Sequence, residues 1–104
     1  MKLKIKDIEW TFAVLPDKEY TAEHGKDSNG ITMKYKQVVH FKESALTLGL
    51  VAHELFHAYS ASCCISSTND LSQDDMEEVG AEIAEFHLDD MIRYRDKIYE
   101  RLSR

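Results

Sequence analysis

The chain has 104 residues, of which 43% are hydrophobic and 31% are charged, and its formal net charge is −6. This length predicts a single domain, residues 1–104, with room for one modest core and not for the two lobes of a large peptidase. The negative charge argues against nonspecific binding to nucleic acid or to an anionic membrane.

The first seven residues alternate charged and apolar side chains, without the continuous hydrophobic stretch of a signal peptide. Nothing further along the chain is long and apolar enough to predict a transmembrane segment. The two cysteines, Cys63 and Cys64, are adjacent, so a disulfide between them would be a strained ring that braces no distant parts of the fold. We therefore expect a reduced, cytoplasmic protein.

The N-terminal half has the pattern of a small β-sheet. Apolar and polar residues alternate from Ile8 to Val14, which predicts a half-buried strand that ends at Leu15-Pro16-Asp17 and is followed by a loop. The turn residues 26–30 precede a second alternating segment, Ile31 to Tyr35. A third and more buried strand is predicted over Gln37 to Phe41.

The C-terminal half has the spacing of helices. Ser44 is a candidate N-cap for a helix that runs to Ser60 or Ala61, because apolar residues recur at helical intervals between them. Polar residues from 62 to 71 predict a loop.

Ser72 then offers a capping box with Asp75 for a second helix that extends to Leu102, with a break expected past Leu88. The predicted fold class is therefore α+β: an N-terminal sheet of about three strands packed on two helices.

The first of these helices carries the sequence H-E-x-x-H at residues 53–57. Residues four apart lie one turn apart on the same face of a helix, so the imidazoles of His53 and His57 can both bind one zinc ion. Glu54 lies beside them and has the chemistry of a general base. The alternative interpretation is a helix that happens to carry two ordinary histidines.

A hydrolytic zinc site has three protein ligands and an open position, so a third ligand is needed. Cys63 lies six residues past His57, the spacing at which some zincins place a third histidine, but Ser60 replaces the glycine of that motif. Glu78 and Glu82 lie one turn apart on the following helix and share a face. The residues alone leave these three candidates open.

The motif, followed 21 residues past His57 by Glu78-Val79-Gly80-Ala81-Glu82, resembles the gluzincin metallopeptidases, which carry H-E-x-x-H on one helix and E-x-x-x-D on a glutamate helix. The order of elements from about Gly30 to Leu88 also resembles the minimal gluzincins and, more distantly, the peptidase domain of the ImmA/IrrE type. The A-x-x-F-A-A-x-L-L-M-P tail of that type is absent.

The resemblance implies a Zn²⁺ cofactor held by His53, His57 and Glu78, with Glu82 in place of the family's Asp as the carboxylate that orients a ligand histidine. It also implies hydrolysis of a peptide or protein substrate, with Glu54 as the general base. The sequence indicates no oligomeric state.

Two further hypotheses concern the surroundings of this site. A residue that stabilises the oxyanion has no clear match, and the candidates are Tyr59, His40, His24 and Tyr94. The competing class is a catalytically silent or autoinhibited zinc protein that regulates a protein partner, with the basic tail 93–104 lying across an acidic cleft.

Overall fold

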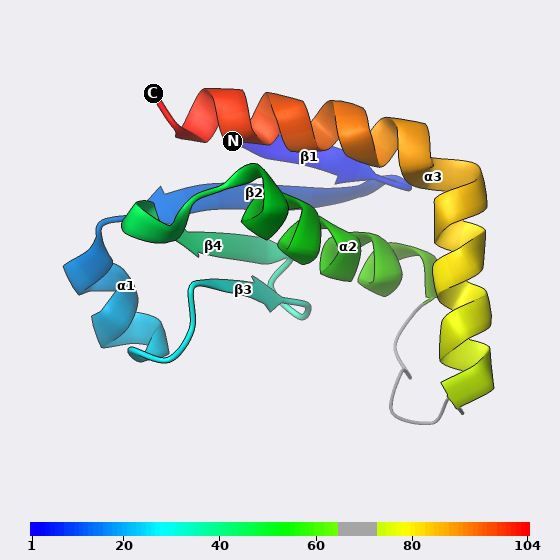
Figure 1. Cartoon of the computed structure of the whole chain (residues 1–104), viewed down its shortest axis with the longest axis horizontal. Coiled ribbons are helices and arrows are strands. Elements are labelled where there is room, and N and C mark those ends of the chain that lie inside the picture. Colours follow the sequence, from blue (N-terminus) through cyan, green and yellow to red (C-terminus); the bar gives the residue numbers. More distant parts are fainter. Residues whose placement is uncertain (65–72) are drawn as a thin grey trace.

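The computed structural model describes residues 1–64 and 73–104 and has the predicted α+β fold (Figure 1). Two strands come first, and a short helix separates them from the next two. The elements in chain order are β1 (Lys2–Ile5), β2 (Ile8–Leu15), α1 (Asp17–His24), β3 (Gly30–Met33), β4 (Val38–Lys42), the 3-10 helix η1 (Glu43–Ala45), α2 (Leu48–Cys64) and α3 (Gln73–Leu102).

The four strands form one sheet in the order β1-β2-β4-β3. The pairs β1–β2 and β3–β4 are antiparallel, whereas β2 and β4 are parallel and therefore need a crossover connection, which contains α1. The three predicted strands are confirmed. The prediction of about three strands missed the fourth, β1.

One face of the sheet packs on α2 and α3 and holds the core. Buried apolar residues from the sheet, α2 and α3 form a single cluster: Leu3, Ile5, Trp10, Phe12, Val39, Phe41, Val51, Leu55, Ala58, Tyr59, Ile83 and Ile98. The indole Nε1 of Trp10 donates a buried hydrogen bond of 2.8 Å to Ser62 Oγ on α2. This bond satisfies the polar atoms that the sheet and helix bury together.

The segment after β2 was expected to be a loop, and this prediction was wrong, because α1 forms there. Tyr20 is the buried residue of α1, so the helix has no apolar stripe that sequence periodicity could detect. The carboxylate of Asp17 accepts the N–H of Ser44 at 2.9 Å and so ties the start of α1 to η1.

The two predicted helices exist, but their starts and ends differ from expectation. Ser44 does not cap α2, because it lies in η1; instead Thr47 Oγ1 accepts the N–H of Leu50 at 3.0 Å, the geometry of an N-cap. Helix α2 reaches Cys64, so the first part of the predicted loop 62–71 is helical. The predicted cap at Ser72 lies outside the described residues.

Helix α3 runs to Leu102 as one hydrogen-bonded helix, although Figure 1 shows a sharp bend between its yellow N-terminal part and its orange-red C-terminal part. The C-terminal part lies along β1, and the hydroxyl of Tyr94 donates to the carbonyl oxygen of Lys4 at 3.4 Å. Among the described helices, none is long and apolar enough to cross a membrane.

Candidate functional site

The H-E-x-x-H motif lies in the middle of α2, and its two histidines share a face as predicted. The ring centroids of His53 and His57 are 5.0 Å apart and the rings meet edge to face. Both residues are exposed to solvent. The helix therefore presents two metal-binding side chains together at its surface, one turn apart.

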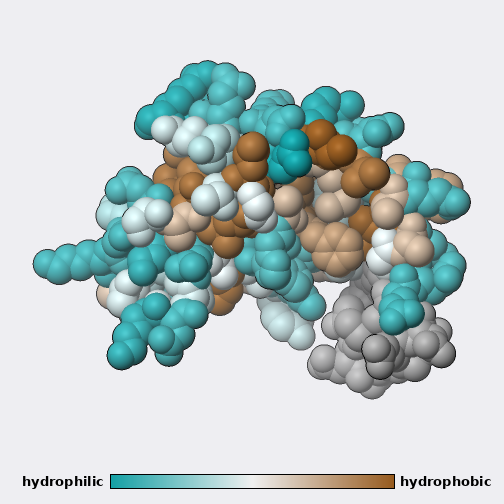
Figure 2. Space-filling view, in the orientation of Figure 1, coloured by the Kyte–Doolittle hydropathy of each residue, from teal (hydrophilic) through white to brown (hydrophobic). Residues whose placement is uncertain are grey.

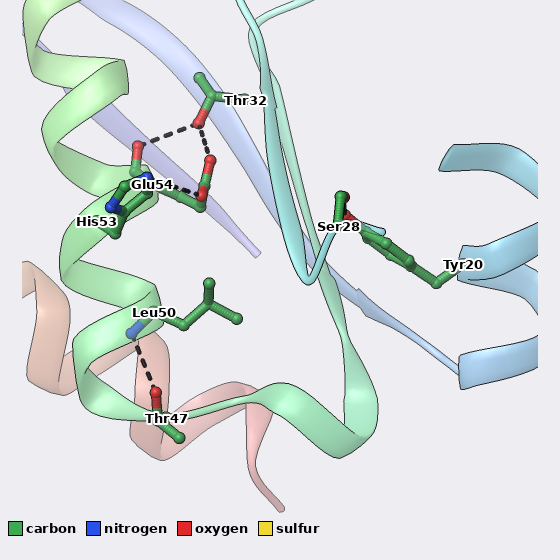
Figure 3. A network of polar contacts seen from close by, with 7 residues as sticks. All are labelled: Tyr20, Ser28, Thr32, Thr47, Leu50, His53 and Glu54. Atoms are coloured by element: carbon green, nitrogen blue, oxygen red, sulfur yellow. Dashed lines mark hydrogen bonds and ion pairs between the residues drawn. The ribbon is translucent and has the colours of Figure 1, made fainter. Parts of the chain in front are cut away.

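Glu54 lies beside this pair and is buried, with only 5% of its surface exposed. One carboxylate oxygen, Oε1, accepts a hydrogen bond of 2.9 Å from Thr32 Oγ1 on β3, and the other, Oε2, lies 3.8 Å from His53 Nε2 (Figure 3). Thr32 Oγ1 also lies 3.2 Å from the backbone carbonyl oxygen of Glu54, so its single hydrogen is shared between two acceptors. The strand thus fixes the carboxylate in one position.

Strand β3 comes this close to α2 because residue 30 is a glycine. A Cβ atom on Gly30 would lie 3.0 Å from Glu54 Cγ and 3.1 Å from Leu50 Cδ1, tighter than ordinary van der Waals contact. Gly30 therefore leaves the space that the Glu54 side chain occupies, and it brings the edge strand of the sheet alongside the motif.

A groove open to solvent lies between β3 and the start of α2, with Glu54 and His53 in its wall. The described lining residues are Ser28, Asn29, Gly30, Ala45, Thr47, Gly49, Leu50, His53 and Glu54. None of these comes from α3. Figure 2 shows apolar side chains in a band across the middle of this face, with hydrophilic residues around it, and Leu48 and Phe56 of α2 are among the exposed apolar residues.

The basic tail packs elsewhere. Arg93, Arg95 and Arg104 form their ion pairs with acids of α3 itself, Asp90, Asp96 and Glu100. Within the described residues, the groove has no lining from this segment. The idea of a tail that lies across the cleft therefore has no support in the fold.

Helix α3 passes close to the motif helix, but among the described side chains no acid of α3 joins the two histidines in a group of three ligands. A Cβ on Gly80 would lie 3.9 Å from Phe56 Cζ, which places the glutamate segment beside α2. Glu78 and Glu82 are both exposed. The described residues do not bring the side chains of His53, His57 and Glu78 within 4.8 Å of one another, so Glu78 as a ligand remains a prediction.

Cys63, the other candidate ligand, is half-buried and packs against the apolar core. Within the described part of the chain, it joins no group of three ligand side chains gathered within 4.8 Å. Its position is that of a small core residue.

The four candidates for an oxyanion-stabilising residue lie away from the groove. Tyr59 is buried against His87, with 5.5 Å between ring centroids, and burial raises the pKa of Tyr59 well above its usual range. Tyr94 bonds to β1. His24 and His40 bond to each other, Nε2 to Nδ1, at 2.9 Å.

Sequence reasoning missed the two residues of β3 that position Glu54. Gly30 was interpreted only as part of a turn and Thr32 only as the polar member of an alternating strand. No family model, curated protein or solved structure matches the chain, so the function rests on the chemistry of the residues themselves.

Proposed function

We propose that the protein is a zinc-dependent metallopeptidase that hydrolyses peptide bonds and acts in the cytoplasm. The observation that carries the proposal is the buried carboxylate of Glu54, which Thr32 fixes beside the exposed imidazole pair of His53 and His57. Glu54 and His53 line an open groove. When bound, zinc would polarise the scissile carbonyl and lower the pKa of a bound water. His53, His57 and Glu78 are the proposed ligands.

In this proposal Glu54 is the general base: it accepts the proton of the attacking water and delivers it to the leaving amine. Burial and the hydrogen bond from Thr32 hold its carboxylate in one orientation, which spares the reorganisation that a free side chain would need. Strand β3 is the edge of the sheet and borders the groove. An extended peptide substrate could pair with such an edge as an added strand.

Glu78 is exposed on α3, beside the motif helix. An exposed glutamate side chain has several rotatable bonds and can reorient. With zinc bound, its carboxylate would be the third ligand. Glu82, one turn further on, would then be the carboxylate that orients a ligand histidine, as the resemblance to the gluzincins implies.

The separation of Glu78 from the histidines also favours a second candidate, a catalytically silent zinc-binding protein that regulates a protein partner. The two candidates differ in what they require of Glu54. A regulator needs no general base, whereas hydrolysis needs one beside the zinc.

The test of the peptidase uses a mixed peptide library with cleavage followed by mass spectrometry. Glu54→Gln should lower cleavage by about 10²–10⁴-fold while zinc stays bound, because the base is lost and no ligand is removed. Cleavage at the wild-type rate by Glu54→Gln would sink the general-base role. Zinc binding without cleavage by the wild type would favour the regulator.

The test of the third ligand is the zinc content of Glu78→Ala, with Glu77→Ala as the matched control on the same helix. Loss of one equivalent of zinc in Glu78→Ala, with no loss in Glu77→Ala, supports the assignment, because the neighbouring variant removes the same charge. Full retention of zinc by Glu78→Ala, with loss in Glu82→Ala or Cys63→Ala, would reassign the ligand.

A further inference from the structure

Three side chains of metal-binding type meet between α1 and β4, away from the motif. Atoms of Glu23, His24 and His40 that can bind a metal all lie within 4.8 Å of one another, and they are the one such group in the part of the chain that the structure describes. His24 Nε2 lies 2.9 Å from His40 Nδ1 and 3.9 Å from Glu23 Oε1.

The sheet places this group on the face opposite the H-E-x-x-H motif. Successive residues of a strand point to opposite faces, and the neighbours of His40 in β4, Val39 and Phe41, are fully buried in the core beneath α2 and α3. His40 therefore points to the other face, where α1 carries His24 and Glu23. The pairing of His40 with Ala13 on β2 and Ile31 on β3 holds it within the sheet.

Packing against neighbouring residues holds the ring of His24 in place. The His24 side chain is only 6% exposed, and its ring packs on Tyr20 with 4.9 Å between centroids. Glu23 is exposed and borders solvent, which leaves a side from which an ion and water can enter.

The spacing is close to that of ligands around one ion. Ligand atoms about 2.0–2.1 Å from a tetrahedral zinc are about 3.3 Å apart. The two imidazole nitrogens need to separate by about 0.4 Å, and the carboxylate oxygen needs to approach His24 by about 0.6 Å, relative to this geometry. Side-chain rotations of that size need no change in the backbone.

We propose that Glu23, His24 and His40 form a binding site for a divalent transition metal of the zinc type, independent of the H-E-x-x-H motif. Two imidazoles and a carboxylate suit zinc, cobalt, nickel and copper better than magnesium or calcium, which prefer oxygen ligands. The ion fastens the last turn of α1 to β4. The site lies on the face of the sheet opposite the groove, so it is separate from the proposed peptidase site.

The competing explanation is a plain hydrogen bond between two neutral imidazoles, in which one ring donates and the other accepts. That bond needs neither Glu23 nor a metal. The two explanations therefore differ in whether zinc binds and in whether Glu23 affects the affinity.

The experiment uses the full chain with His53→Ala and His57→Ala, so that its result does not depend on the proposed peptidase site. Zinc is titrated into this variant by calorimetry, and thermal unfolding is followed with and without zinc. One equivalent should bind, and the melting temperature should rise on the order of 10 °C at a zinc concentration 100 times the dissociation constant.

Two substitutions in the same background locate the site. His40→Gln and Glu23→Gln should each weaken zinc binding by more than the roughly 10–100-fold that loss of an outer-shell partner causes. Glu19→Gln removes an equal charge from the same helix and serves as the control, with unchanged affinity. Glu23 is exposed, so its variant folds even if His40→Gln does not.

No zinc bound by the His53→Ala, His57→Ala protein overturns the proposal and leaves the hydrogen bond as the explanation. Equal affinity in Glu23→Gln and Glu19→Gln also overturns it. The peptidase proposal fails by a different result, which is zinc at this site with no cleavage by the wild-type chain.

Discussion

Gly30→Ala tests the close approach of β3 to the motif helix without assuming any activity. The added methyl group would lie 3.0 Å from Glu54 Cγ and 3.1 Å from Leu50 Cδ1, so these side chains must give way by a few tenths of an ångström. Glu54 cannot yield freely, because Thr32 holds its carboxylate. Overpacking of this kind costs about 1–3 kcal/mol.

The same substitution lowers the conformational entropy of the unfolded chain, which stabilises the folded state by about 0.4–1 kcal/mol. We therefore expect a net loss of about 1 kcal/mol in the free energy of unfolding, equivalent to a fall of about 4–8 °C in the melting temperature. The assay is thermal unfolding followed by far-ultraviolet circular dichroism.

Gly49→Ala is the matched control, since Gly49 lines the same groove and a Cβ there would meet only Thr47 Oγ1, at 3.9 Å. It should leave stability unchanged or raise it by about 0.5 kcal/mol, because alanine favours a helix over glycine. A Gly30→Ala protein at least as stable as the wild type would show that β3 does not pack on Glu54 as described.

Two further predictions concern single polar contacts. Thr32→Val keeps the shape of the side chain and removes the donor to Glu54, which should cost about 1–3 kcal/mol in urea unfolding. An equally large cost in the Glu54→Ala background would contradict a bond to the Glu54 side chain. For Asp17, hydrogen bonds from the Ser44 side chain and backbone lower the carboxyl pKa below 3.8, so the charged form stabilises the fold above that pH and this contribution is lost as the pH falls through the folded-state pKa. The stability gap between wild type and Asp17→Asn in chemical denaturation should therefore be present at pH 7 and shrink below pH 3.8, and a gap that persists unchanged in acid would refute the assignment.

Local patterns predicted those parts of the fold in which the pattern itself drives folding. The strands around Phe12 and Val39, and the helices that carry Leu55 and Ile83, are buried on one face, so apolar spacing reveals them. The pair His53 and His57 was found for the same reason, since a spacing of four on a helix fixes their geometry.

The missed elements lack such signals. Strand β1 turns into β2 through Lys6 and Asp7, both with positive φ (48° and 69°), and this turn usually carries Asn-Gly. Helix α1 buries only Tyr20 and so has no stripe to recognise. Ser44 was predicted as the N-cap because serine is a common capping residue. The N-cap is Thr47 instead: its side chain accepts the N–H of Leu50 and its carbonyl oxygen accepts the N–H of Val51.

The missed parts of the sites are contacts between elements. Thr32 reaches Glu54 across 22 residues, and His24 meets His40 across 16, and no spacing rule connects them. Both contacts follow from the strand order, which places β3 at the edge and β4 inside it. A single sequence does not show which strands pair, so it does not reveal the strand order.

The contact between the C-terminal part of α3 and β1 has a consequence for how the chain folds. Tyr94 meets Lys4 across 90 residues, and Ile98 is fully buried in the same cluster as Ile5. During synthesis the first hairpin therefore emerges long before α3, and the part of its apolar face that α3 covers stays exposed until residue 98 leaves the ribosome. Closure of so long a loop makes docking of this helix a late step, and a chain cut near Asp90 would lose part of its core. Figure 1 shows the two termini near each other. In a circular permutant that joins them and opens the chain elsewhere, α3 and β1 would therefore be synthesised in succession.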